Sequence, residues 1–173
     1  FKTTSSALKV HGITDLFRQQ NGISRKEAMG RFLGDLRDYD PLLICHFLEF
    51  DLYLLKVELE RAGVRENLTR VPSFCTMLAT RYLTGRSQSR YLRLNELYAL
   101  LFYKKLQNHH DALADASATA ECFFELLKSN DITEAIIEKQ LVATSTSSNS
   151  HITDDPDRGY YMLLILVLIL LFV

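Results

Sequence analysis

The sequence has few of the residues that build disulfide frameworks, zinc sites or nucleotide-binding loops. It contains three cysteines, Cys45, Cys75 and Cys122, which are scattered and form no Cys-x-x-Cys pair. This set predicts neither a zinc site nor a disulfide framework, and it favours a reducing compartment. No glycine-rich phosphate loop, no Gly-x-Ser-x-Gly turn and no internal repeat occurs. The sequence therefore does not support a nucleotide-binding loop of that kind or a serine hydrolase.

The chain also lacks an excess of positive charge. Its formal net charge is −1, which predicts no general affinity for nucleic acid. The segment 56–105 differs, because seven Arg and three Lys stand against four Glu there, a net charge of +6. This segment could hold backbone phosphates or form an ordinary solvated face, and both interpretations stay open. Tyr82 and Tyr91 within it could stack on bases, although aromatic residues at such spacing are more often part of a core.

A helix is predicted over residues 112–128. Asp111 is a good N-cap, and mostly alanines and long apolar side chains follow it. At about 100° per residue, Asp115 is expected to lie opposite the apolar stripe, among small residues that let another element or a substrate come close. The alternative is a capping acid followed by an ordinary amphipathic helix. The predicted stripe comprises Leu113, Ala116, Ala120, Phe123, Phe124 and Leu127.

A second acid lies where a predicted strand passes into a predicted helix. The apolar run at 41–46 is suited to a buried strand, and an amphipathic segment follows at 52–63. Asp51 lies between the two. It is either a functional carboxylate or the N-cap of the following helix.

The motifs around both acids resemble those of a known enzyme family. Residues 110–115 follow the pattern His-x-Ala-Leu-x-Asp, and residues 46–51 are similar to His-Asn-x-x-Phe-Asp, with Phe47 in the Asn position. The chain resembles the DEDDh family of 3′-5′ exonucleases, which includes the proofreading epsilon subunit of bacterial DNA polymerase III. Shorter matches lie in the family's order at 10–14, 74–77, 94–97 and 120–127. The resemblance covers residues 1 to about 129.

The resemblance implies an α/β, ribonuclease H-like fold and hydrolysis of phosphodiester bonds at nucleic-acid 3′ ends. Two cations, Mg²⁺ or Mn²⁺, would be held by acids that include Asp51 and Asp115. His110 would be the general base, with His109 as the competing candidate. DNA is expected more than RNA, in proofreading or repair, with a DNA polymerase subunit as a partner. The expected substrate contacts are His46, Phe50, Arg86 and Arg90.

The first motif of this family, an Asp-x-Glu on an early strand, has no counterpart before His46. We therefore expect the opening strands of the fold to be absent from these residues. The full-length protein would then be the metal-dependent exonuclease, and this chain alone would be inactive. The alternative is a non-catalytic nucleic-acid-binding or membrane-tethered interaction module that lacks the first metal-binding motif. The early acids are Asp15, Glu27, Asp35, Asp38 and Asp40.

The character of the chain changes after the exonuclease-like domain at 1–129. Residues 130–159 are expected to form a short helix, near 130–141, and a polar linker. Residues 160–173 carry no charge and are predicted to form a hydrophobic helix. At about 1.5 Å per residue it would span about 21 Å, less than the roughly 30 Å of a hydrocarbon core. It is either part of a transmembrane anchor of a cytoplasmic protein or a buried C-terminal helix.

The predicted fold is thus an α/β ribonuclease H-like domain without its first strands, in which helices dominate. One strand is expected near 41–46. Helices are expected near 25–38, 51–62, 75–83, 92–102 and 112–128.

Overall fold

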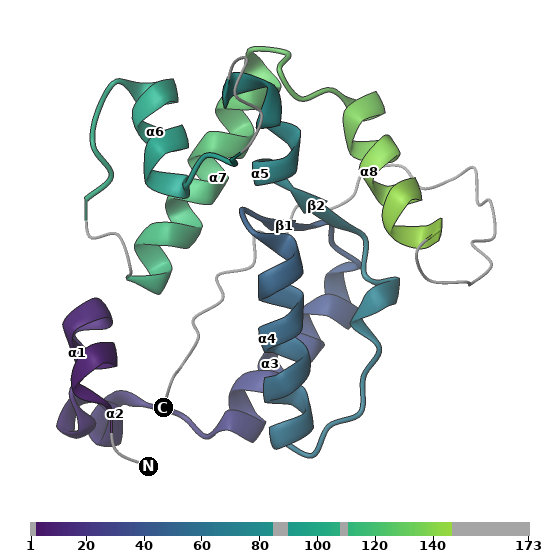
Figure 1. Cartoon of the computed structure of the whole chain (residues 1–173). Helices are drawn as coiled ribbons and strands as arrows, with labels where there is room; N and C mark the ends of the chain where they lie inside the picture. Colours follow the sequence, from purple (N-terminus) through teal and green to yellow (C-terminus); the bar gives the residue numbers. More distant parts are fainter. Residues whose placement is uncertain (1–2, 85–89, 108–110, 147–173) are drawn as a thin grey trace.

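The computed structural model describes residues 3–84, 90–107 and 111–146, which form helices around a small parallel sheet (Figure 1). The sheet pairs β1 (Leu43–Cys45) with β2 (Ser73–Cys75). Leu43 lies opposite Ser73 and Cys45 opposite Cys75. Within the described ranges the architecture is therefore mixed α/β and mostly helical.

Five longer helices surround the sheet: α3 (Arg25–Tyr39), α4 (Leu48–Arg61), α6 (Leu94–Phe102), α7 (Ala112–Lys128) and α8 (Glu134–Thr146). In Figure 1, α3 and α4 lie below the strands and α6 and α7 above them, with α1 and α2 at the lower left. The shorter elements are α1 (Ser5–His11), α2 (Asp15–Asn21), η1 (Leu68–Arg70), α5 (Thr76–Ala79) and η2 (Arg81–Thr84).

The strands are buried on both faces, as parallel sheets usually are. Ile44 and Phe74 belong to the larger core cluster, which also contains buried residues of α6 and α7. Leu43 and Cys45 belong to a cluster on the other face, together with Leu48 of α4. The alternation follows from strand geometry, in which successive side chains point to opposite faces. The sheet thus holds α7 on one face and α4 on the other.

A separate cluster joins α3 to α4. It is built on Phe32 and Leu33 of α3 and on Leu55 and Leu59 of α4, with Leu68 of η1. The α3 helix begins at the N-cap Ser24, whose side chain accepts a hydrogen bond from the backbone N–H of Glu27 at 3.1 Å. This cluster holds the C-terminal end of α4, while the first turn of α4 packs on the strands.

The α8 helix packs on β2 through a side chain that pairs with the strand backbone. The Gln140 side chain accepts a hydrogen bond from the N–H of Cys75 at 2.9 Å and donates one to the Cys75 carbonyl at 3.2 Å. An amide side chain therefore takes the place of a neighbouring strand at that residue. The two residues lie more than sixty positions apart in the sequence, so their contact could not be predicted from it.

Most sequence-predicted elements are confirmed. The helix at 112–128 has the predicted bounds, and the helices near 25–38, 51–62 and 92–102 and the strand near 41–46 are present with shifted ends. The predicted helix at 75–83 was wrong at its start, because Cys75 ends β2, and only residues 76–79 are α-helical. The helix expected near 130–141 lies at 134–146, so it extends into the predicted linker. Helices α1, α2 and the strand β2 were not predicted.

No helix in the described ranges combines the length and apolarity needed to cross a membrane. The predicted hydrophobic helix at 160–173 lies outside the described residues.

Candidate active site

Asp51 lies in the first turn of α4, just after β1. It is not the N-cap, as the alternative interpretation had it, because Phe47 holds that position and the Asp51 N–H bonds to the Phe47 carbonyl at 3.1 Å. Burial raises the pKa of the Asp51 carboxyl to about 6, although the Cys45 thiol and the Phe47 backbone act in the opposite direction. Within the described ranges, no Lys or Arg forms an ion pair with Asp51.

This environment fits a carboxylate that receives a cation. A half-buried acid without a counter-charge resists ionisation, and an arriving cation removes that cost. Perturbed carboxyl groups of this kind are concentrated at functional sites, although structural acids show them too. Asp51 is therefore the strongest candidate for a metal-linked side chain in the described part of the chain.

Asp115 lies in the first turn of α7, four residues after the N-cap. The Asp111 side chain caps the helix by accepting the N–H of Ala114 at 2.9 Å, as predicted. The carbonyl of Asp115 accepts the hydroxyl of Thr119 at 2.9 Å. The carboxylate is thus carried by a helix whose start is well defined.

The predicted apolar stripe of α7 is confirmed only in part, since Ala116 and Phe123 are buried. Leu113 and Phe124 are 60% and 52% exposed, whereas Ala118 and Cys122 are buried. The buried residues that follow Asp115 at i+3, i+4 and i+7 are Ala118, Thr119 and Cys122. Small side chains let α7 approach the sheet and α6 closely, and the inward face combines them with Phe123 and Leu126. Asp115 consequently lies at the end of the inward face, not opposite to it.

The two acids come from helices that pack on the same strand, since both α4 and α7 contact β1. In the part of the chain that the structure describes, no group of three or more His, Cys, Asp or Glu side chains is close enough together to hold a metal ion. The predicted general base His110 and the predicted phosphate contact Arg86 lie outside the described residues. The described residues thus provide two carboxylates, which are suitable ligands for a divalent cation, on two helices that pack on the same strand.

His46 directly follows β1, and both of its ring nitrogens are engaged. Nε2 lies 3.0 Å from the Leu92 carbonyl, which can only accept, so Nε2 carries a hydrogen. Nδ1 lies 3.0 Å from the Thr76 hydroxyl. Burial lowers the pKa of His46, which favours the neutral ring, so Nδ1 is an acceptor. The single proton of the Thr76 hydroxyl is shared between Nδ1 and the Cys45 carbonyl, which lies 3.2 Å from Thr76 Oγ1. The ring links β1, α5 and the segment before α6, and its predicted contact with substrate remains a prediction.

Much of the positive charge at 56–105 has partners within the protein. Arg90 donates to both carboxylate oxygens of Glu96, at 3.0 and 2.8 Å, so its predicted role on phosphate competes with an ion pair. Arg81 lies over the ring of Tyr91 at 5.4 Å, and the Tyr82 hydroxyl donates to Asp131 at 2.6 Å. These contacts favour the interpretation of this region as an ordinary solvated face. Tyr82 and Tyr91, which are 50% and 38% exposed, each have a partner within the protein.

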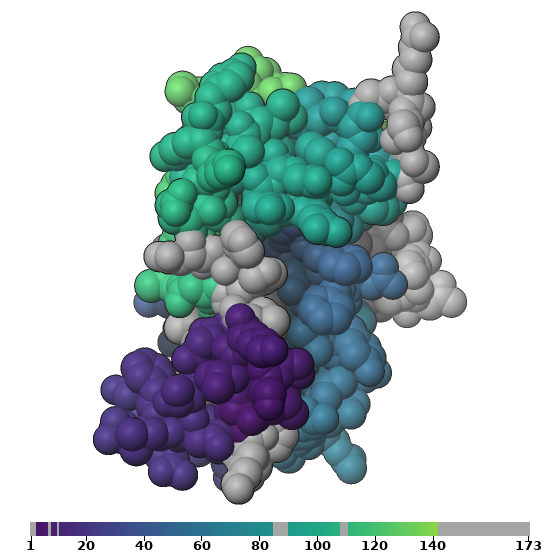
Figure 2. Space-filling view, turned by 60° about the vertical axis from the view of Figure 1, so that its left-hand side comes forward, coloured from purple at the N-terminus to yellow at the C-terminus, as the bar shows by residue number. Residues whose placement is uncertain are grey.

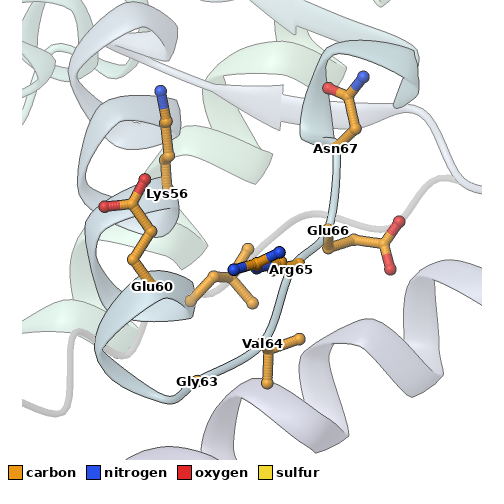
Figure 3. Close-up of a pocket in the computed structure, with 8 residues that line it drawn as sticks. Lys56, Glu60, Gly63, Val64, Arg65, Glu66 and Asn67 are labelled. Atoms are coloured by element: carbon orange, nitrogen blue, oxygen red, sulfur yellow. The ribbon is translucent and has the colours of Figure 1, made fainter.

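An open pocket of about 670 Å³ lies at the other end of α4 (Figure 3). Its wall combines Lys56 and Glu60 on α4 with Arg65, Glu66 and Asn67 on the segment that follows, so both signs of charge line it. Its lining begins at Lys56, five residues after Asp51, and includes neither Asp51 nor Asp115.

Phe50 is the predicted substrate contact whose side chain remains available. It is 48% exposed and stacks on Phe47, with ring centroids 5.6 Å apart and an interplanar angle of 21°. Phe47 attracted attention in the sequence only as a departure from the family pattern. Its exposure could not be predicted from the sequence, but the three-residue spacing of Phe47, Phe50 and Tyr53 is visible there.

Comparison with known proteins supports the same interpretation. The family model described as Exonuclease, of the RNase T type, matches residues 2–123. This match supports a ribonuclease H-like domain, and it implies a nucleic-acid substrate. No curated protein and no solved structure gave a match. Because the matched range includes both acids and most of the chain, this protein belongs to the exonuclease family of the RNase T type.

Proposed function

We propose that this protein is a 3′-5′ exonuclease that hydrolyses phosphodiester bonds at nucleic-acid 3′ ends. The observation that carries the proposal is Asp51, a half-buried carboxyl with a raised pKa at the junction of β1 and α4. It stands in the segment that resembles the second motif of the DEDDh exonucleases. DNA is the preferred substrate, in proofreading or repair, with a DNA polymerase subunit as a partner.

In this proposal Asp51 and Asp115 hold the divalent cations. Carboxylate oxygens are hard ligands, which suit Mg²⁺ or Mn²⁺. When bound, a pair of such cations stabilises the negative charge that develops on the attacking and leaving oxygens. The acids themselves orient the site, because each is carried in the first turn of a helix that packs on β1.

The role of general base, which takes a proton from the attacking water, is assigned to His110. A neutral imidazole accepts a proton at physiological pH, and a general base that takes it from the attacking water contributes about 10²- to 10⁴-fold in rate. This role rests on the resemblance of residues 110–115. The proposed substrate contacts are His46, Phe50, Arg86 and Arg90.

The test is the metal-dependent release of mononucleotides from a single-stranded DNA labelled at its 3′ end. In Mg²⁺ or Mn²⁺, Asp51→Asn and Asp115→Asn are each expected to lower the rate by at least about a hundredfold, since each removes one charge from the site. Asp111→Asn is the matched control. It changes a carboxylate in the same helix but keeps a good N-cap, so release should be unchanged.

A second measurement separates catalysis from binding. Divalent cations stabilise a protein that binds them in its folded state, so the thermal midpoint should rise with Mn²⁺ concentration and Asp51→Asn should reduce this rise. Unchanged release in Asp115→Asn would contradict the catalytic assignment. Binding of 3′ ends by the protein, with no release in any divalent cation, would instead indicate a non-catalytic nucleic-acid-binding module.

The cytoplasmic location and the membrane anchor at 160–173 remain predictions from the sequence. Removal of residues 160–173 should move the protein from the membrane fraction to the soluble fraction. An unchanged distribution would contradict the anchor.

A further inference from the structure

Arg90 is held by a carboxylate that is itself fixed in place. Glu96 lies in the first turn of α6, and its Oε2 accepts the backbone N–H of Arg93 at 2.9 Å, which caps the helix. The same carboxylate accepts both hydrogen bonds that Arg90 donates, at 3.0 and 2.8 Å. Because the cap fixes Glu96, the ion pair restricts the orientation of the Arg90 guanidinium.

The ion pair uses only one of the three guanidinium nitrogens. Both bonds leave from Nη1, and no residue in the described ranges accepts a hydrogen bond from Nε or Nη2 of Arg90. The Arg90 side chain is 63% exposed. Its Nε–H and Nη2–H groups form the planar pair of donors that matches two oxygens of a phosphate. This edge of the guanidinium is therefore available although Nη1 is engaged.

The segment that carries Arg90 is anchored next to the proposed site. The Leu92 carbonyl, two residues after Arg90, accepts a hydrogen bond from Nε2 of His46, which directly follows β1. The α4 helix, with Asp51 in its first turn, begins two residues after His46. In Figure 2 the teal surface of the segments near residues 80–100 adjoins the blue surface that contains α4. Arg90 is thus carried on a segment that contacts the strand end leading to Asp51.

We propose that Glu96 is a positioning residue, which orients the Arg90 guanidinium for a phosphate group of the bound nucleic acid. The inference rests on the proposed function, because Arg90 is one of its substrate contacts. An arginine that is already oriented loses less side-chain freedom when a phosphate binds, so its contact is stronger than that of a freely moving arginine. Glu96 acts through Arg90 and does not touch the substrate.

The sign of the effect distinguishes positioning from simple neutralisation. A carboxylate near a phosphate repels it, so an uncharged residue in place of Glu96 should tighten binding if Glu96 only cancels the charge of Arg90. If Glu96 orients Arg90, the same substitution should weaken binding although it removes a negative charge. Glu96→Gln suits the test, since glutamine can also cap the helix at this position.

The experiment measures equilibrium binding of a single-stranded DNA with a fluorescent 5′ label, in EDTA and over a series of salt concentrations. The variants are Glu96→Gln, Arg90→Gln and the double variant. The matched control is Glu125→Gln, because Glu125 also pairs with a cation, Lys128, at 3.3 Å, and its side chain is exposed to the same extent as that of Glu96, 34%. Circular dichroism verifies that all variants keep their helices.

Glu96→Gln should weaken binding by about 2- to 10-fold, which is the cost of ordering one long side chain on binding. Arg90→Gln should weaken binding by about 10-fold or more and reduce the slope of log K against log salt concentration by about 0.7, since one phosphate contact is lost. In the Arg90→Gln background, Glu96→Gln should cause no further weakening, because it acts through Arg90. Glu125→Gln should bind as the wild type does.

Three results would overturn the inference. Tighter or unchanged binding by Glu96→Gln would mean that the carboxylate only neutralises Arg90. Equal weakening by Glu96→Gln with and without Arg90 would mean that the substitution acts through the fold of α6. Wild-type affinity and salt dependence in Arg90→Gln would remove the phosphate contact itself. None of these results depends on hydrolysis, so the proposed nuclease activity is judged separately by the Asp115→Asn assay.

Discussion

The substitution Asp51→Asn should make the metal-free protein more stable at neutral pH. Burial raises the pKa of the Asp51 carboxyl from 3.8 to about 6, so the folded protein holds this proton more tightly than the unfolded chain does. Between these two values stability falls as pH rises, and above pH 6 the full cost of ionising a half-buried acid is present. The asparagine side chain carries no charge, so the variant does not have the cost of ionising a half-buried acid.

The size of the effect follows from the pKa. Each tenfold change in acidity corresponds to about 1.4 kcal/mol, so the displacement from 3.8 to about 6 amounts to about 3 kcal/mol. Because Asp51 is partly exposed, solvent screening reduces this figure, and we expect a gain of about 2 kcal/mol above pH 7. For a chain of this size that corresponds to an increase in Tm of about 4–8 °C. Below pH 4 the two proteins should be equally stable.

The assay is urea denaturation in EDTA at pH 4, 6 and 7.5, with unfolding monitored by circular dichroism. Glu49→Gln is the matched control, because Glu49 lies in the same first turn but is exposed. It should lose about 0.3–1 kcal/mol at neutral pH through the helix dipole, which is the opposite sign. Addition of Mn²⁺ should then stabilise the wild type more than Asp51→Asn, and narrow the difference between them.

A loss of stability in Asp51→Asn at pH 7.5 would refute this reasoning. It would mean that the ionised carboxylate makes favourable contacts that exceed the cost of its burial, and that Asp51 is a structural acid. An equal gain at pH 4 and pH 7.5 would also count against it, because the effect would then not come from ionisation.

Three further substitutions test the packing around the site by urea denaturation. Gln140→Leu should cost about 2 kcal/mol, because the N–H and C=O of buried Cys75 lose their side-chain partner; an unchanged midpoint would mean that water replaces the amide. Asp111→Ala should cost about 1 kcal/mol through loss of the cap on the Ala114 N–H, and an equal cost in Asp111→Asn would argue against capping as the cause. Phe74→Ala should cost about 3–5 kcal/mol, since Phe74 is fully buried at the centre of the larger core cluster; a cost below about 1 kcal/mol would indicate that the core collapses around the gap.

The order of elements and the two acids could be predicted because their signals are local. A cap at Asp111 and a helix-forming run after it define α7, and an apolar run followed by Asp51 defines the passage from β1 to α4. The second strand was missed because three residues at 73–75 carry too little pattern to distinguish a strand from the start of a helix. The helices α1 and α2 are seven residues each, too short for a clear apolar period.

The orientation of α7 could not be predicted from its own residues. Hydrophobic size favoured a side that includes Leu113 and Phe124, but the buried side includes Ala118 and Cys122, whose small side chains allow close packing, together with Phe123. Which face wins depends on the distance between α7 and its neighbours, and that distance is set by residues far away in the sequence.

The sequence by itself determined the chemistry available to this protein, because residue types and their spacing within one helix or strand suffice to specify two carboxylates, their helix starts and the family pattern. Tertiary structure decided which groups remain available for function. Contacts across the fold engage His46 with Thr76 and Leu92, while they leave Asp51 without an ion pair in the described ranges and Phe50 exposed. Such partners are chosen by packing between distant segments, whose energies no local pattern records.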